Sequence, residues 1–298
     1  MDLLSIDSLS DAQIRGILDR GEQWFKRNRS GAKSVETLAG RIVFNVFYEN
    51  STRTAMSFAT ATHRLGASAI SLSVEHSSVK KGESLQDTAA TLDAMRPDLL
   101  VIRHRDNGAP AAVAEIMDAP VINAGDGTNE HPTQALLDAA TIRHRFGQFD
   151  GLKVAICGDV NHSRVARSNA KLLPRLGAEV RLAGPPELMP SGNPHLSVDE
   201  AISGADVVMM LRVQRERLDQ DLGDGPGEYL SRYGLTEDRF RRAAADAVVM
   251  HPGPMNRGVE IDGAIADDPE RSLIRTQVEM GVAVRMACLE FLIGGSAA

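Results

Sequence analysis

Residues 41–54 read RIVFNVFYENSTRT, and the change of character inside this stretch indicates the fold. Residues 41–48 form a continuous apolar run rich in β-branched and aromatic side chains, which is typical of a strand covered on both faces. Residues 54–66 follow with helical spacing and end at Gly66. The stretch therefore predicts a buried strand that leads directly into a helix.

The same alternation continues on both sides of this stretch. An amphipathic helix precedes it, with Ser10 or Asp11 as the cap. The other predicted strands are 68–74, 97–103, 120–125, 152–159, 179–185, 205–211 and 247–253. The other predicted helices are 84–95, 110–117, 132–146, 163–176, 197–203, 236–244 and 271–293. Alternating strands and helices of these lengths predict an α/β fold with right-handed crossovers and doubly wound parallel sheets.

Two interruptions divide the pattern. A turn-rich joint at 146–151, FGQFDG, separates two runs of similar length, and a polar, Gly- and Pro-bearing stretch interrupts the second run at 213–234. We predict a first domain over 1–147 and a second over 148–274, with the C-terminal helix, about 275–298, packed back on the first. Such sheets bind ligands beyond the carboxyl ends of their strands, so we expect the active site in a cleft between the domains.

Composition narrows the class of protein. The 298 residues are 43% hydrophobic and carry a net charge of −7, which disfavours nucleic acid and anionic membranes as partners. The N-terminus lacks a signal-peptide pattern, and no stretch has the ~20 apolar residues of a membrane span. Cys157 and Cys288 lie in apolar segments without a C-x-x-C pair. We expect a cytoplasmic protein with reduced, buried thiols.

The segment STRT at 51–54 sits where a strand ends and a helix begins. Backbone N–H groups at a helix start have no partners within the helix and favour an anion, and Ser51, Thr52, Arg53 and Thr54 add donors. The plainer alternative is an N-cap followed by a solvated arginine. This segment alone leaves both interpretations open.

Other strand ends of the first domain are also rich in hydrogen-bond donors. Lys80 and Lys81 follow the second strand, although such a pair is commonly a solvated loop tip. Arg103 ends the third strand, and the fourth leads to His131 and Gln134 at a helix start. A lone histidine is more often structural than catalytic, but its place at the ligand-binding edge favours a functional role.

The strand ends of the second domain carry arginines and a stiff turn. The turn after 152–159 lacks the G-x-x-G continuation of a dinucleotide site but offers Arg164 at a helix start. The segment LRVQRERLD at 211–219 provides a cluster of donors: Arg212, Gln214, Arg215 and Arg217. In the final turn, Gly253-Pro254 is a candidate cis peptide.

The inventory of donors fits a phosphate on one domain and carboxylates on the other. The sequence has no Walker loop, no H-E-x-x-H and no Gly-x-Ser-x-Gly elbow, and we expect neither a metal nor a cofactor.

Four motifs in order, S-T-R-T, K-K-G-E, H-P-T-Q and H-P-G-P, resemble the carbamoyltransferase family nearly from end to end. Within that family the chain is similar to the aspartate branch, because the ornithine branch typically has H-C-L-P where this chain has H-P-G-P. The resemblance implies carbamoyl transfer from carbamoyl phosphate to L-aspartate, a step of pyrimidine biosynthesis. Ala55 and Ala59 depart from the family pattern, outside the ligand contacts.

The resemblance also assigns residues by their place in the motifs. Those implied to bind carbamoyl phosphate are Ser51, Thr52, Arg53, Thr54, Arg103, His131, Gln134, Gly253 and Pro254, with Arg53, Thr54, Arg103 and His131 as the catalytic set. Those implied to hold aspartate are Lys81, Arg164, Arg212 and Gln214. Lys81, with Ser77, matches a loop that reaches a neighbouring subunit's site, which implies a homotrimer with shared active sites.

The resemblance leaves three alternatives open. The first is whether regulatory chains or a dihydroorotase-like enzyme join the trimer, which the sequence does not decide. Another amine acceptor would make the chain a different carbamoyltransferase. A non-catalytic anion-binding subunit would keep the donors without turnover.

Overall fold

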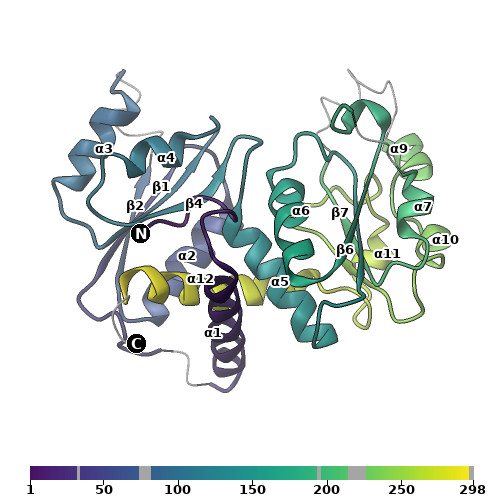
Figure 1. Ribbon diagram of the computed structural model, residues 1–298, viewed down its shortest axis with the longest axis horizontal. Coiled ribbons are helices and arrows are strands. Elements are labelled where there is room, and N and C mark those ends of the chain that lie inside the picture. Colours follow the sequence, from purple (N-terminus) through teal and green to yellow (C-terminus); the bar gives the residue numbers. More distant parts are fainter. Residues whose placement is uncertain (32–33, 74–81, 193–195, 214–225, 295–298) are drawn as a thin grey trace. The chain divides into compact units, whose positions relative to one another are not determined.

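The computed structural model describes residues 1–31, 34–73, 82–192, 196–213 and 226–294. Contacts divide the chain into unit 1, Met1–Ala140 with Val278–Ala298, and unit 2, Thr141–Gln277. Two helices, α5 and α12, run across the division (Figure 1). Each unit contains a four-stranded parallel sheet, so the prediction of two parallel-sheet α/β domains is confirmed.

Unit 1 is built on a sheet with the strand order β2-β1-β3-β4. Its strands are β1 Ile42–Phe47, β2 Ser68–Ser73, β3 Leu99–His104 and β4 Val121–Asp126. Its helices are α1 Asp11–Arg29, α2 Thr52–Arg64, α3 Leu85–Asp93, α4 Ala109–Ala114 and the first part of α5 Pro132–Phe146, followed late in the chain by most of α12 Ile274–Ile293.

Alternating side chains of this sheet enter two different layers. Phe44 and Val46 of β1, with Leu100 and Ile102 of β3, form an apolar cluster with side chains of α3 and α4. The intervening residues face the other layer, where α2 packs on β1 and β2. Figure 1 shows α1 and α12 on the same side as α2. Arg103 pairs with Phe47 in the β1–β3 register, so its side chain belongs to the α2 side.

The C-terminal helix is fastened to the N-terminal one by a shared acid. Glu290 of α12 accepts hydrogen bonds from Arg20 Nε and from Trp24 Nε1 of α1, both at 2.7 Å. Trp24 is buried, and the Arg20 guanidinium lies 4.5 Å from the centroid of its ring. Residues 266 or more positions apart in sequence are thereby joined in unit 1.

Unit 2 repeats the plan with the strand order β6-β5-β7-β8. Its strands are β5 Lys153–Cys157, β6 Glu179–Ala183, β7 Val207–Met210 and β8 Val248–Met250. Its helices are α6 Arg164–Leu176, the 3-10 helix η3 Pro186–Leu188, α7 Val198–Ile202, α9 Pro226–Arg232, α10 Glu237–Phe240 and α11 Gly263–Ala266. Every predicted strand has an observed counterpart. The short helices η3 and α11 were not predicted.

The polar stretch 213–234 is more than an interruption, which corrects the sequence interpretation. Helix α9 occupies its final part and begins at Pro226, since proline is favoured in the first turn, where no N–H is needed. Tyr229 is fully buried in a cluster with Leu188, Val213 and Val259. One large aromatic side chain therefore anchors a helix whose overall composition is polar.

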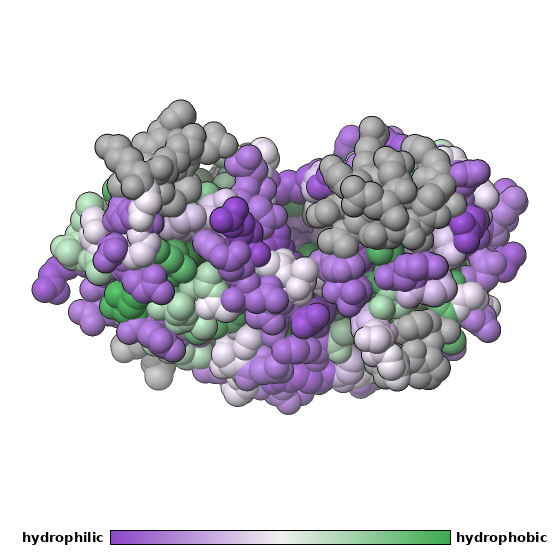
Figure 2. Space-filling view, turned by 90° about the horizontal axis from the view of Figure 1, so that it is seen from above, coloured by the Kyte–Doolittle hydropathy of each residue, from purple (hydrophilic) through white to green (hydrophobic). Residues whose placement is uncertain are grey.

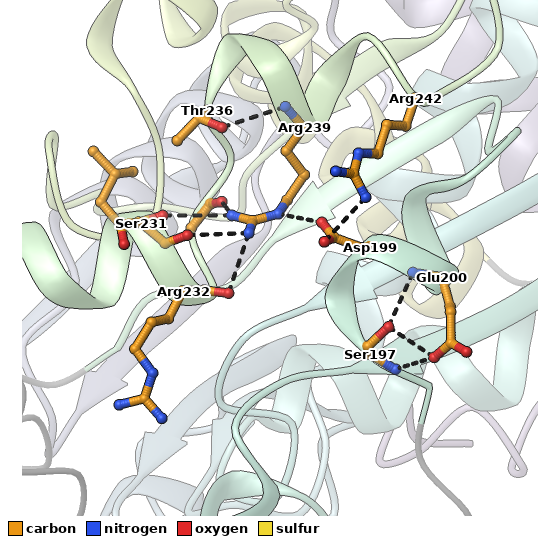
Figure 3. A network of polar contacts seen from close by, with 10 residues as sticks. Ser197, Asp199, Glu200, Ser231, Arg232, Thr236, Arg239 and Arg242 are labelled. Carbon is orange, nitrogen blue, oxygen red and sulfur yellow. Dashed lines mark hydrogen bonds and ion pairs between the residues drawn. The ribbon is translucent and has the colours of Figure 1, made fainter.

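The end of α9 is held by a single guanidinium, shown in Figure 3. Arg239 of α10 donates from Nη2 to the carbonyl oxygens of Ser231 and Arg232, at 3.1 and 3.2 Å, and from Nη1 to that of Gly234. Its Nε donates to Asp199 of α7 at 2.6 Å. The last carbonyls of a helix lack partners within the helix, so Arg239 caps α9 and links it to α7.

Hydrophilic side chains dominate the face of the molecule in Figure 2, and hydrophobic ones appear there in small patches. Over the described residues, no helix combines the length and apolarity that a membrane span requires. Cys157 and Cys288 are free thiols in the core, and burial raises the pKa of each to about 12. The predicted burial of both cysteines is confirmed.

Candidate active site

Three of the predicted phosphate-binding segments lie along one edge of the unit 1 sheet. β1, β3 and β4 are neighbours and run parallel, so their carboxyl ends meet at the same edge. The loop from β1 leads to Ser51, β3 carries Arg103 near its end, and the turn after β4 leads to His131. Segments that are far apart in sequence are brought to one edge by the strand order.

The start of α2 combines a cap with exposed donors. Ser51 is the N-cap, and its Oγ accepts a hydrogen bond from the N–H of Thr54 at the long distance of 3.4 Å. Thr52 and Arg53 are exposed, whereas Thr54 is only 5% exposed. The first turn of a helix presents N–H groups and a positive dipole end, so this segment provides what an anion needs.

Arg103 is held at the sheet edge by two neighbouring strands. Its Nη2 donates to Glu49 Oε1 at 2.9 Å, and its Nη1 donates to the carbonyl oxygen of Ala124 at 3.4 Å. The side chain is 11% exposed, and that of Glu49 is 37% exposed. The guanidinium is thus fixed in direction while one carboxylate next to it remains open to water.

His131 and Gln134 occupy the start of α5, as the sequence predicts. Both are largely buried, and the carbonyl of His131 accepts the N–H of Gln134 at 3.0 Å, which begins the helix. Gln134 Nε2 donates to Asp138 Oδ1, one turn further on, at 3.1 Å. This contact orients the amide side chain of Gln134 within unit 1.

The turn that delivers His131 is organised by Asp126, which the sequence interpretation did not single out. Its carboxylate accepts the N–H groups of Gly108 and Glu130, at 2.7 and 3.1 Å, and the side-chain amides of Asn123 and Asn129, at 2.8 and 3.0 Å. Four donors on one buried carboxylate give a rigid turn. The run GDGTNE was the available signal, because Asp and Asn organise turns through their side chains.

Next to Arg103, His104 is neutral in character. Its Nδ1 accepts the N–H of Asp106 at 3.0 Å, and its ring lies 4.7 Å from that of Tyr48. Burial lowers the pKa of His104, and the nearby Asp106 carboxylate opposes that effect. An unprotonated Nδ1 is required for the observed hydrogen bond, so geometry and burial agree.

Unit 2 presents a second set of predicted residues at the carboxyl edge of its own sheet. Arg164 is the first residue of α6, behind the cap Ser163, whose Oγ accepts the N–H of Ala166 at 3.1 Å. Arg212 follows β7 and is exposed. β5, β7 and β8 are neighbours, so these arginines and the turn after β8 share one edge.

The turn after β8 is shaped by a buried histidine and acid. His251 Nδ1 accepts the N–H of Gly253 at 2.8 Å, so its Nε2 carries the proton and faces Glu260 Oε1 at 3.3 Å. Glu260 also accepts the N–H of Asn256. Gly253 has φ +67°, and the Gly253-Pro254 peptide is cis, which confirms that hypothesis. The sequence interpretation did not single out His251 or Glu260, whose hydrogen bonds shape this turn.

Several predicted site residues lie outside the described residues. These are Ser77, Lys80, Lys81, Gln214, Arg215 and Arg217. Among the residues that the structure does describe, no group of three or more His, Cys, Asp or Glu side chains is arranged to hold a metal ion.

Family models match nearly the whole chain. The carbamoyl-P binding domain of aspartate/ornithine carbamoyltransferase matches residues 1–144, and the Asp/Orn binding domain matches residues 150–292. The first match contains β1 to β4, and the second contains β5 to β8.

Curated relatives are similar over almost their full length. The aspartate carbamoyltransferase catalytic subunit of Granulibacter bethesdensis is 56% identical over 296 residues, covering 97% of this chain and 94% of the relative. That of Rhodospirillum rubrum is 55% identical over 301 residues, covering 99% and 94%.

Solved structures show the same architecture. Aspartate transcarbamoylase from Trypanosoma cruzi, in complex with carbamoyl aspartate and phosphate, is 32% identical, with a TM-score of 0.85 over 97% of this chain and 94% of that one. Ornithine carbamoyltransferase from Pyrococcus furiosus is 27% identical, with a TM-score of 0.87 over 99% and 98%. The chain belongs to the aspartate/ornithine carbamoyltransferase family.

Proposed function

We propose that this chain transfers the carbamoyl group of carbamoyl phosphate to the amino group of L-aspartate, giving N-carbamoyl-L-aspartate and phosphate for pyrimidine biosynthesis. The observation that carries the proposal is the identity of 56% to a relative named as an aspartate carbamoyltransferase catalytic subunit. The ornithine enzyme has the same fold at only 27% identity. Fold does not separate the two acceptors, so the argument rests on sequence and on the site.

In this proposal the carboxyl edge of unit 1 binds carbamoyl phosphate. The start of α2 holds the phosphate, where backbone N–H groups and the exposed Arg53 fork meet an anion. Thr54, Arg103 and His131 donate to the carbonyl oxygen as it becomes negative. The remaining contacts in unit 1 come from Ser51, Thr52 and Gln134, and the family resemblance adds Gly253 and Pro254 from the turn after β8.

The carboxyl edge of unit 2 holds aspartate in the same proposal. Arg164 and Arg212 pair with the two carboxylates, since a guanidinium fork matches a carboxylate with two parallel hydrogen bonds. Gln214, together with Lys81 of a neighbouring subunit, completes this half; both lie outside the described residues. Ornithine has a cationic side chain, and like charge would repel it from these arginines.

The reaction needs no covalent enzyme intermediate. The uncharged amine of aspartate attacks the carbonyl carbon, a C–N bond forms, and the carbonyl oxygen becomes an oxyanion. The C–O bond to phosphate then breaks, the carbonyl reforms, and the leaving phosphate accepts the proton lost by the amine. The chain contributes position and oxyanion stabilisation, and each donor to the oxyanion is worth roughly a hundredfold or more in rate.

A homotrimer with shared active sites is part of the proposal, and we place it in the cytoplasm. The support is the match of Lys81 and Ser77 to a loop that serves a neighbouring subunit's site in this family. Mixing an Arg53→Ala chain with a Lys81→Ala chain should restore part of the activity, because some sites then contain neither change. Absence of recovery after confirmed subunit exchange would argue against shared sites.

The decisive experiment is a panel of amine acceptors with carbamoyl phosphate. We expect release of phosphate and formation of carbamoyl aspartate with L-aspartate, and no product with L-ornithine or D-aspartate. A bisubstrate phosphonate that carries the aspartate skeleton should inhibit. Turnover with ornithine alone would assign the other branch of the family, and phosphate binding without any turnover would indicate a non-catalytic subunit.

A further inference from the structure

A buried guanidinium lies beneath the first turns of α2 in unit 1. Arg285 of α12 is only 3% exposed, and its Nη1 donates to Ser57 Oγ of α2 at 2.5 Å. Its guanidinium carbon lies 5.1 Å from the ring centroid of Phe58. Figure 1 shows α2 and α12 on the same side of the unit 1 sheet.

This charge has no ion-pair partner among the described residues. Arg285 makes one hydrogen bond and one aromatic contact there, and its buried Nε has no acceptor. Burial lowers the pKa of Arg285 to about 10, and the Asp138 carboxylate opposes that effect only through space. The side chain is therefore cationic at neutral pH in a place where an isolated charge is costly.

The space around the guanidinium is kept open by a glycine. Gly281 lies one helical turn before Arg285 on α12, and a Cβ added there would be 2.9 Å from Arg285 Nη1 and 3.3 Å from Leu137 Cδ2. Even alanine would press on the guanidinium. The absence of a side chain at 281 therefore leaves room for the cation.

Two hydrogen bonds in series connect this cation to Thr54, the residue expected to contact substrate. Ser57 Oγ accepts from Arg285 Nη1 and donates to the carbonyl oxygen of Thr54, at 3.2 Å. The positive charge of Arg103 also acts on Arg285. Arg285 thus lies behind the predicted phosphate-binding residues Thr54 and Arg103, and Ser57 connects it to Thr54.

We propose that Arg285 is a positioning residue for phosphate binding, a buried cation whose counter-ion is the phosphate group bound at the start of α2. The inference rests on the proposed function and deepens it. A phosphate bound at the start of α2 offsets the cost of burying the Arg285 charge. That charge in turn strengthens phosphate binding, because it acts through a region of low dielectric constant. In addition, the hydrogen bonds from Arg285 to Ser57 and from Ser57 to Thr54 hold Thr54 in position for the phosphate.

The test compares three variants of the full chain, Arg285→Met, Arg285→Lys and Arg20→Met. Binding of inorganic phosphate is measured by calorimetry, and Tm is measured with and without phosphate. For Arg285→Met we expect the phosphate Kd to rise about tenfold. The Tm without phosphate should stay equal or rise, because replacing a buried charge that lacks an ion pair removes a desolvation cost. The gain in Tm on adding phosphate should shrink accordingly.

Arg20→Met is the matched control, since Arg20 also bridges α12 to the rest of unit 1 but pairs with Glu290 at 2.7 Å. We expect it to lower Tm and leave the phosphate Kd unchanged. Arg285→Lys keeps the charge and should keep most of the affinity. A buried lysine loses its proton at a lower pH than arginine does, so its phosphate affinity should fall more steeply than that of the wild type between about pH 7 and pH 9.

An Arg285→Met protein with the wild-type phosphate Kd and a lowered Tm would overturn the proposal and make Arg285 a packing residue. If that variant does not fold, the lysine variant decides, and a pH profile parallel to the wild type would overturn the proposal equally. Failure of the wild type itself to bind phosphate would instead refute the proposed function.

Discussion

Arg103 Nη2 donates a hydrogen bond to Glu49 Oε1 at 2.9 Å, so the arginine near the end of β3 is held by a carboxylate beyond the end of β1. A bound phosphate or carbonyl oxygen must share this guanidinium with Glu49. The pair therefore couples the affinity for an anion at the sheet edge to one acidic side chain.

Replacing Glu49 with glutamine should strengthen phosphate binding. The change removes a negative charge beside the anion and keeps the shape and an acceptor for Arg103. We expect the phosphate Kd to fall by roughly two- to fivefold, the size of a partly exposed ion pair, with a smaller change at high salt. Calorimetric titration checks this, and weaker binding would mean that Arg103 needs the carboxylate to point into the site.

Replacing Arg53 with alanine should remove turnover without unfolding the chain. Arg53 is exposed at the start of α2, so its loss should change the free energy of unfolding by less than about 0.5 kcal/mol. Loss of the guanidinium from the phosphate should reduce kcat/KM by at least about a hundredfold. Steady-state kinetics and urea unfolding measure the two effects, and near-normal activity would refute the site assignment.

Ser51 should matter more for activity than for stability. Its cap hydrogen bond to Thr54 is long, 3.4 Å, whereas Ser10 caps α1 at 3.2 Å within a reciprocal capping box. We expect Ser10→Ala to cost about 1 kcal/mol of unfolding free energy with unchanged kcat/KM, and Ser51→Ala to cost less but to reduce kcat/KM. Equal kinetic effects of the two substitutions would contradict a role for Ser51 in binding.

Burial of His104 should make the protein less stable in mild acid. Burial lowers its pKa in the folded state, so the unfolded chain binds more protons below the ordinary value of about 6.5. Folding stability should therefore fall as the pH drops from about 6.5 through the folded-state pKa. Unfolding curves over this range should show a smaller slope for His104→Asn, and an unchanged slope would exclude His104 as the source.

The Arg239 cap on α9 should contribute more to the free energy of unfolding than a surface ion pair does. Arg239→Lys loses the fork that contacts Ser231 and Arg232, and we expect it to lower the free energy of unfolding by about 1–3 kcal/mol. Arg241→Lys is the control, because the Arg241 guanidinium pairs with the exposed Asp238, and the change should alter stability by less than about 0.5 kcal/mol. Equal effects would show that the carbonyl contacts are dispensable.

Much of the fold follows from local patterns. Continuous apolar runs such as 41–48 and helical spacing after them predict each strand and the main helices, because periodicity reflects which face of an element is buried. Helix α9 was not predicted from the sequence, because its composition is polar and a single buried side chain, Tyr229, anchors it. Two very short elements, η3 and α11, escaped because three or four residues contain no period.

The candidate site was predicted where a residue stands at a strand end or helix start, as with Arg53, His131 and Arg164. The sequence interpretation missed residues that contact the candidate site through a neighbouring residue. Asp126 was hidden in a turn, and Glu260 acts through His251. Arg285 was hidden in an apolar helix, and Ser57, which it contacts, lies 228 positions away.

The order of the strands and of the main helices, the parallel class of the sheets and the chemistry of the strand ends follow from the sequence alone, because these depend on local side-chain periodicity and residue type. The strand order β2-β1-β3-β4, the tautomer of His251 and the burial of Arg285 without an ion pair among the described residues become visible only in the tertiary structure. The strand order and the burial of Arg285 depend on contacts between segments distant in sequence, and the tautomer of His251 depends on how the turn after β8 folds around its ring. Local side-chain patterns encode neither.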